Sequence, residues 1–192
     1  MEAQMNKEEI LEKAYRMGFE GEHDVRGCAQ CALAAVQDAL GIRNDIVYKS
    51  ASGLAGGAGE CIDGNCGGVS GGIIAMSMFF GRTREEEATV QGRKDKYVSF
   101  RMGAALHDKF MEKYGTVICG GIHKKIYGRA FDLRDDEQKQ MFRDAGAHER
   151  EDGCCAVVGD GARWATELIL DEIEANGLTL EDFKNLIDTK KE

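Results

Sequence analysis

Residues 66–82 read CGGVSGGIIAMSMFFGR, and this stretch decides the fold. The apolar run IIAMSMFF after the glycines predicts a buried helix, and it is too short to span a membrane. Gly67 and Gly71 stand four residues apart and share a helical face, and the same holds for Gly68 and Gly72. Glycine costs a helix about 1 kcal/mol relative to alanine but lets a second backbone approach closely. We therefore expect a central helix in tight contact with its neighbours.

Helix start and stop signals continue through the rest of the chain. Asn6 and Glu9 form a capping-box pattern, Gly41 stands where a helix should end, and no segment alternates with the period of a strand. Further helices are expected over about 25–40, from Thr83 to Gly115, and over about 135–145, 155–175 and 179–190. The sequence thus predicts an all-α protein, a compact multi-helix bundle with a glycine-rich central helix pair. We expect one domain over residues 1–192, with a core over about 10–175 and a C-terminal helix over about 179–190.

Composition excludes several classes of protein. The chain has 192 residues with 25 glycines and no proline, and its net charge of -9 disfavours a nucleic-acid binder that relies on a basic surface. The charged N-terminus lacks the apolar core of an export signal, and no stretch supplies the roughly 20 apolar residues of a membrane span. We therefore expect a cytoplasmic protein without nucleic-acid partners or membrane insertion.

Seven cysteines require a chemical explanation in a chain of this kind. In a reducing compartment, several cysteines more often ligate a metal or carry redox chemistry than form a disulfide framework. They are Cys28, Cys31, Cys61, Cys66, Cys119, Cys154 and Cys155. They occupy four separate places, each at the edge of a predicted helix or in the turn before one. Helices that each contribute one soft ligand can enclose an iron–sulfur cluster or a zinc ion.

The local cysteine patterns are weaker signals. Cys28 and Cys31 form a Cys-x-x-Cys motif near a helix start, where the pKa of a thiol falls. No thioredoxin-like context, haem-binding histidine or second Cys-x-x-Cys accompanies it. Cys154 and Cys155 point about 100° apart on a helix, so we expect only one to face the site. For any single thiol, an inert role as a small buried hydrophobe stays open.

The histidines and the charged stretches add little evidence about the functional site. His123 follows Cys119 by four residues and shares its helical face, so it is either an accessory ligand or an ordinary, partly exposed histidine. Three other histidines lie in charged surroundings and are predicted to be exposed: His23, His107 and His148. Two charged stretches are predicted to be solvated helix faces and connections: residues 82–96 and 134–152.

The glycine-rich centre resembles a known family. ASGLAGGAG at residues 51–59, followed by CGGVSGGIIAMSMFFGR, is similar to the redox-active family named for its C-GCAxxG-C-C pattern. The resemblance covers about residues 10–175 and implies a small helical protein with four characteristic cysteines. Carried over, these are Cys28 in GCAQ, Cys66 in CGGVSG, Cys119 in TVICGGI, and Cys155 three residues before Val158. Gly68 replaces the motif's alanine, and three cysteines are additional: Cys31, Cys61 and Cys154.

The resemblance extends to the non-haem iron domain of split-Soret cytochromes, in which four cysteines hold an iron–sulfur centre. This chain lacks the Cys-x-x-Cys-His haem sites of those proteins, so only the cluster half of the comparison carries over.

Three functions follow as alternatives. The first is an electron carrier or oxidoreductase that binds an iron–sulfur cluster, most simply [2Fe–2S]. Its ligands would be Cys28, Cys66, Cys119 and Cys155, with Cys31, Cys61, Cys154 and His123 as accessory ligands. The second is a metal-free thiol–disulfide protein that cycles a pair such as Cys28 with Cys31, or Cys61 with Cys66. The third is a structural zinc site. The acidic surface suits a basic redox-partner protein, and the chain could also form a homodimer.

Overall fold

The computed structural model describes residues 5–187, apart from the side chain of Asn185. Its helices are α1 (Lys7–Asp24), α2 (Cys28–Leu40), α3 (Asp45–Ser50), a 3-10 turn η1 (Ser52–Leu54), α4 (Ala55–Ala58), α5 (Gly67–Phe80), α6 (Val90–Tyr114), α7 (Cys119–Tyr127), α8 (Asp136–Asp144), α9 (Cys154–Ala175) and α10 (Glu181–Ile187). Within these residues the only β pairing is one isolated antiparallel bridge between Asn65 and Ile118. The all-α prediction is confirmed.

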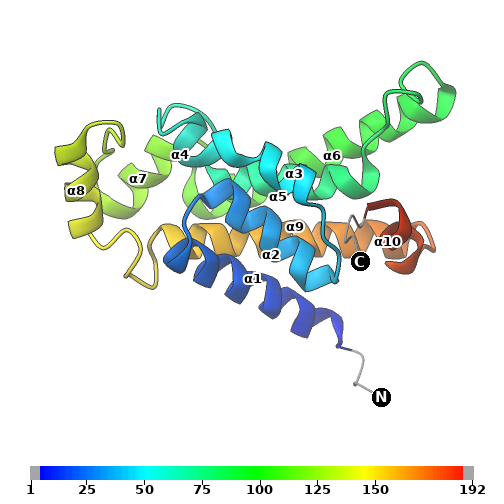
Figure 1. Cartoon of the computed structure of the whole chain (residues 1–192), viewed down its shortest axis with the longest axis horizontal. Coiled ribbons are helices and arrows are strands. Elements are labelled where there is room, and N and C mark those ends of the chain that lie inside the picture. Colours follow the sequence, from blue (N-terminus) through cyan, green and yellow to red (C-terminus); the bar gives the residue numbers. More distant parts are fainter. Residues whose placement is uncertain (1–4, 188–192) are drawn as a thin grey trace.

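Three helices form the centre of the bundle. α2, α5 and α9 pack against one another, α1 covers α2 and α9, and α6 lies against α5 and α9 (Figure 1). Large, fully buried side chains from these helices fill the centre, among them Leu33, Phe110 and Ile169. The short helices α4, α7 and α8 gather at the end of the bundle where α2 and α9 begin (Figure 1).

The glycines of α5 make the close contacts that the sequence predicts. A methyl group at Gly71 would overlap the carbonyl oxygen of Ala29 in α2. On the other side, a methyl group at Gly68 would stand 3.0 Å from the carbonyl oxygen of Val157 in α9. The two glycine rows therefore let α5 pack closely against the backbones of α2 and α9.

Two predicted helix starts are wrong by several residues. The second helix begins at Cys28 rather than near residue 25, because Arg26 and Gly27 take left-handed backbone angles (φ 70° and 91°) that separate it from α1. The helix expected from Thr83 begins at Val90 instead, capped by the side chain of Thr89. Thr83 does exchange hydrogen bonds with Glu86, but they close only a turn.

The ends of the helices agree better with prediction. The capping box at Asn6, the left-handed residue Gly41, and the boundaries of α8 are confirmed. The last helix runs from Glu181 to Ile187, and the rest of the stretch predicted up to residue 190 lies outside the described residues. In the described part of the chain, no helix is both long enough and apolar enough to cross a bilayer.

Candidate redox site

Four of the seven cysteines line one cavity of about 140 Å³ at the α7–α8 end of the bundle. Each stands where a different helix begins: Cys28 opens α2, Cys66 precedes α5, Cys119 opens α7 and Cys154 opens α9. The expectation that separated helix starts bring thiols together is met for these four.

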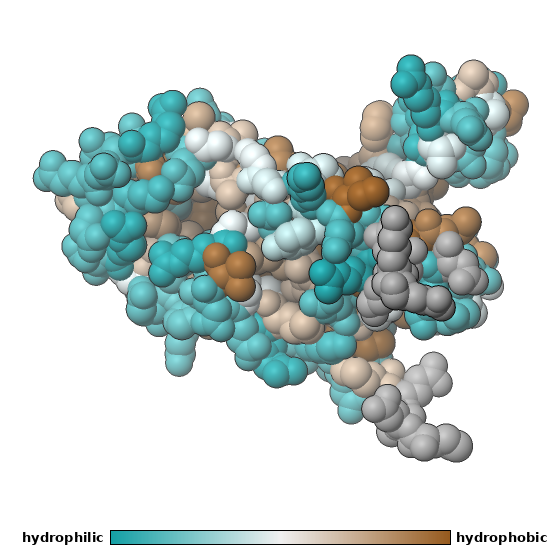
Figure 2. All heavy atoms as spheres, in the orientation of Figure 1, coloured by the Kyte–Doolittle hydropathy of each residue, from teal (hydrophilic) through white to brown (hydrophobic). Residues whose placement is uncertain are grey.

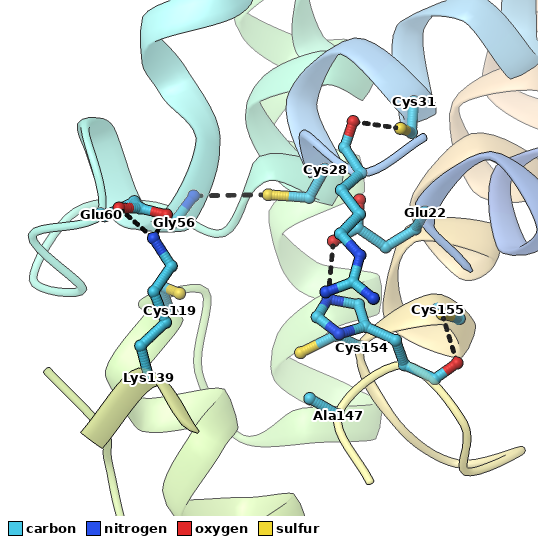
Figure 3. Close-up of polar contacts among 12 residues, drawn as sticks. Glu22, Cys28, Cys31, Gly56, Glu60, Cys119, Lys139, Ala147, Cys154 and Cys155 are labelled. Atoms are coloured by element: carbon cyan, nitrogen blue, oxygen red, sulfur yellow. Dashed lines mark hydrogen bonds and ion pairs between the residues drawn. The ribbon is translucent and has the colours of Figure 1, made fainter. Parts of the chain in front are cut away.

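The position of Cys28 depends on glycines. The N–H of Gly56 donates a hydrogen bond of 3.4 Å to the Cys28 Sγ atom (Figure 3). Any side chain at Gly67, the residue after Cys66, would overlap that sulfur atom. The close approach of α2 and α5 thus brings the first cysteine beside the second.

A short backbone link fixes Cys66 relative to Cys119. The Cys66 N–H donates to the carbonyl of Val117 at 2.8 Å, and the Cys119 N–H donates to the carbonyl of Gly64 at 3.0 Å. These bonds flank the Asn65–Ile118 bridge. The starts of α5 and α7 are therefore held side by side by backbone hydrogen bonds.

Tyr127 holds the fourth pocket cysteine. The Cys154 N–H donates to the Tyr127 hydroxyl at 3.0 Å and to the carbonyl of Ala147 at 2.9 Å. The same hydroxyl donates to the Cys154 Sγ atom at 3.6 Å. Sequence reasoning missed Tyr127, because it contacts Cys154 only after α7 has packed beside the start of α9.

The other three cysteines do not line the cavity. The Cys31 thiol donates to the carbonyl of Arg26 at 3.2 Å, and the Cys155 thiol donates to the carbonyl of His148 at 3.4 Å (Figure 3). Cys61 lies in the loop after α4, with its sulfur 3.7 Å from the Gly59 carbonyl. Cys154, which was expected to be accessory, therefore takes the pocket position expected for Cys155. Adjacent residues of a helix point about 100° apart, and the packing of α9 turns Cys154 toward the cavity and Cys155 toward the His148 carbonyl.

Burial dominates the electrostatics of the pocket thiols. It raises the pKa of Cys28, Cys119 and Cys154, and it raises that of Cys66 to about 11. The helix starts oppose this effect, since the N–H groups of Gly68 and Val69 lower the pKa of Cys66. A helix N-terminus also carries roughly half a positive elementary charge. The pocket thus disfavours thiolates that have no positive partner. The helix N-termini that line it carry partial positive charge, which favours a bound group of negative charge.

Two histidines are less exposed than predicted. His123 is 2% exposed, with its Nε2 atom 3.7 Å from the Cys119 sulfur, and its ring stacks on Phe142. His148 is 7% exposed and pairs with the buried carboxylate of Glu22 in α1 at 3.7 Å (Figure 3). His148 was expected to be exposed because its neighbours in sequence are charged, and His123 was expected to be either an accessory ligand or partly exposed. Packing of α8 and its following loop over the pocket buries them instead.

Charged residues also line the pocket. Arg26, Arg143 and Lys139 contribute to its wall, and Lys139 pairs with Glu60 at 2.7 Å. The prediction that residues 134–152 are only solvated surface is therefore wrong for α8. Its inner side chains close the cavity, while the neighbouring polar residues face the solvent.

Burial of His123 predicts a pH-dependent stability. Burial lowers its pKa from 6.5 to about 4, so the unfolded chain takes up this proton at a higher pH than the folded chain. Stability from this group is complete above about pH 6.5 and falls towards pH 4, with a loss of about 2 kcal/mol between about pH 7 and pH 5. Urea unfolding of metal-free protein and of His123→Gln checks this. Between about pH 7 and pH 5, the free energy of unfolding should fall by about 2 kcal/mol less in the variant than in the wild type. An equal fall in both proteins would contradict the prediction.

The donor set is chemically suited to a metal–thiolate centre, but its spacing is not that of one ion. In residues 5–187, no three His, Cys, Asp or Glu side chains are grouped as ligands of a single metal ion. A mononuclear zinc site would need four donors about 2.0–2.3 Å from the ion. A [2Fe–2S] cluster divides four thiolates between two irons, so its ligands line a wider space.

The fold and pocket define a class first: an all-helical protein with several thiols buried at helix starts. The chain belongs to the family described as "Putative redox-active protein (C_GCAxxG_C_C)", whose profile matches residues 27–168. This confirms the family expected from the glycine-rich centre, over a shorter range than the sequence suggested. The matched range includes all four pocket cysteines.

One relative shows how far the similarity reaches. A protein of Archaeoglobus fulgidus named "Uncharacterized protein" is 29% identical over 137 residues, which are 69% of this chain and 85% of the relative. No solved structure matches the chain.

Proposed function

We propose that this protein is a cysteine-based electron-transfer protein whose pocket holds an iron–sulfur cluster, most simply [2Fe–2S]. The ligands are Cys28, Cys66, Cys119 and Cys154. The observation that carries the proposal is that four thiols from four helix starts line one cavity. Membership of a redox-active family supports the general class. When bound, such a cluster supplies one-electron transfer at a potential set by burial and by hydrogen bonds to sulfur.

The cost of burying charge supports a metal-bound state. Four thiolates in a buried cavity are unfavourable unless positive charge compensates them. Metal ions provide most of that charge, and the four helix N-termini provide more. Without a metal, burial keeps the thiols protonated near neutral pH, which makes them poor nucleophiles.

The spacing of donors favours a cluster over zinc. No group of three potential ligands in the described residues is gathered around one point. The cavity is instead wide enough for several atoms, because a single water needs only about 10–15 Å³ of such space. A zinc-only protein remains an outcome that the experiment distinguishes.

The chain's own groups are placed to adjust such a centre. The Gly56 N–H donates to the Cys28 sulfur, and the Tyr127 hydroxyl donates to the Cys154 sulfur. Hydrogen bonds to cluster sulfurs stabilise the more negative, reduced state and so raise the reduction potential.

The metal-free alternative has less support in the geometry. Cys28 and Cys31 turn to different partners, Gly56 and the Arg26 carbonyl. Burial also raises the pKa of Cys31 to about 12, which suppresses its thiolate. Cys61 likewise contacts a loop carbonyl, whereas Cys66 lines the cavity.

Anaerobic purification followed by a visible absorption spectrum and analysis of iron, acid-labile sulfide and zinc tests the proposal. We expect brown protein with iron and sulfide in equal amounts, about two of each per chain for [2Fe–2S]. Colourless protein that takes up no iron or sulfide on reconstitution would refute the cluster. Zinc without iron after anaerobic preparation in iron-replete cells would support the structural zinc alternative.

We also propose a redox-partner protein and a cytoplasmic location. The reducing cytoplasm suits seven unpaired cysteines. The net charge of -9 favours a basic partner overall, but the pocket wall carries two cations, Arg26 and Arg143, beside the Lys139–Glu60 ion pair. A partner surface that reaches the pocket should therefore be acidic where it meets these cations.

A further inference from the structure

The long helix α6 carries an apolar stripe on the side that faces away from the bundle. Four of its residues stand seven apart, and one aromatic residue lies between them: Val90, Tyr97, Phe100, Ala104 and Met111. The four large ones are 42–65% exposed. On the opposite side of the helix, Met102, Leu106 and Phe110 are buried in the core. Apolar residues repeated every seven residues occupy one of the two seam positions of a coiled coil, and the second position holds Arg93, Phe100 and His107 here.

The first half of α6 also extends beyond the rest of the molecule. Together with the loop before it, this half stands clear of α5 and α9 as an arm (Figure 1) and forms a separate lobe of the surface (Figure 2). Tyr97 and Phe100 make an edge-to-face pair on this arm with ring centroids 6.0 Å apart. Two exposed aromatic rings on a projecting helix are costly in water and are enriched at protein interfaces.

Gly103 supports a close neighbour at the middle of this helix. A methyl group there would meet no atom within 4 Å, so no contact inside the chain requires glycine. Glycine in a helix interior costs about 1 kcal/mol relative to alanine. Beside the small side chain of Ala104, it allows a second helix to approach closely.

The charges on α6 favour a second copy of the same helix as its partner, running in the opposite direction. The first half of α6 is basic, with Arg93, Lys94 and Lys96 against one acid. The second half exposes the carboxylates of Asp108 and Glu112, while its lysines, Lys109 and Lys113, pair with Glu167 and Asp160 of α9. Two parallel copies of α6 would bring basic halves together, whereas antiparallel copies bring the basic half of each against the acidic side chains of the other.

We propose that the chain forms a two-fold symmetric homodimer through antiparallel pairing of α6. With the axis near Gly103 in both copies, Phe100 of each copy packs on Ala104 of the other. The same register places Lys94 of each copy beside Asp108 of the other. No residue of α6 lines the thiol pocket, so the dimer does not depend on the function proposed for that pocket.

Sedimentation velocity of the full chain tests the interface. We expect the wild type to have twice the 21.0 kDa mass of the chain. Tyr97→Glu with Phe100→Glu should raise the dimer Kd by about a hundredfold or more, because charge cannot be buried unpaired in the seam. The matched control places glutamates at two other exposed apolar residues, Ile46 and Leu186, and should leave the dimer intact. Circular dichroism confirms that both variants keep their helices.

A wild-type monomer at the highest soluble concentration would overturn the proposal, as would a dimer in the seam variant. Reversing the charges of the Lys94 and Asp108 pair tests whether the two α6 helices run antiparallel. Lys94→Glu should weaken association by roughly tenfold, and adding Asp108→Lys to the same chain should restore it. Failure of the double reversal to restore association would overturn the antiparallel register.

Discussion

Replacing Cys154 by serine should remove the iron–sulfur cluster, with iron and sulfide falling by about tenfold or more relative to the wild type. Cys154 lines the cavity and is held by Tyr127 through two hydrogen bonds. A serine hydroxyl is a much poorer ligand for iron, so the remaining three thiolates should not retain the cluster. Iron and sulfide analysis after anaerobic reconstitution measures the loss.

The neighbouring cysteine gives a matched control. Cys155→Ser makes the same chemical change one residue later, where the side chain contacts the His148 carbonyl rather than the cavity. Serine can keep that hydrogen bond, so the cluster should survive at near wild-type content. The opposite outcome, loss with Cys155→Ser and retention with Cys154→Ser, would restore the ligand set that the family pattern suggested.

Replacing Gly71 by alanine should destabilise the fold by about 3 kcal/mol, although the change adds a single methyl group. That methyl group would overlap the carbonyl oxygen of Ala29, a backbone atom that cannot rotate away. α2 and α5 would have to separate, and the separation would also loosen Cys28 from its place beside Gly67. Urea unfolding followed by circular dichroism measures the stability change.

Gly103 provides the comparison for this variant. It also lies inside a helix, but a methyl group there would meet nothing within 4 Å. Gly103→Ala should therefore stabilise the monomer by up to about 1 kcal/mol through helix propensity alone. Both variants are compared at a concentration where the protein is monomeric. Equal effects at the two positions would show that helix contact is not what Gly71 provides.

The all-helical fold could be predicted because its signals are local. Capping residues such as Asn6, stop residues such as Gly41, and the four-residue spacing of the α5 glycines each act within one or two turns. A helix start was predicted wrongly where two capping residues lie close together in the sequence. Thr83 forms its capping hydrogen bonds, yet Thr89 is the residue that starts α6.

The candidate site was predictable in part. Cysteines at helix starts can be recognised from spacing and glycine context, and the structure brings four of them to one cavity. The choice between Cys154 and Cys155 was not predictable, because adjacent residues of a helix point about 100° apart and only the packing of α9 decides which of them faces the cavity. The Glu22–His148 pair was also not predictable, because the two residues are far apart in the chain and each has charged neighbours.

The sequence by itself determined that the fold is helical, the two glycine faces of α5 and the placement of most thiols at helix starts. It did so because hydrogen bonding within a helix and its caps involves only near neighbours along the chain. Only the tertiary structure decided which thiols share a cavity, that His123 and His148 are buried, and that the apolar stripe of α6 faces outward. Those properties depend on which surfaces of distant segments meet, and that is settled only when the helices pack.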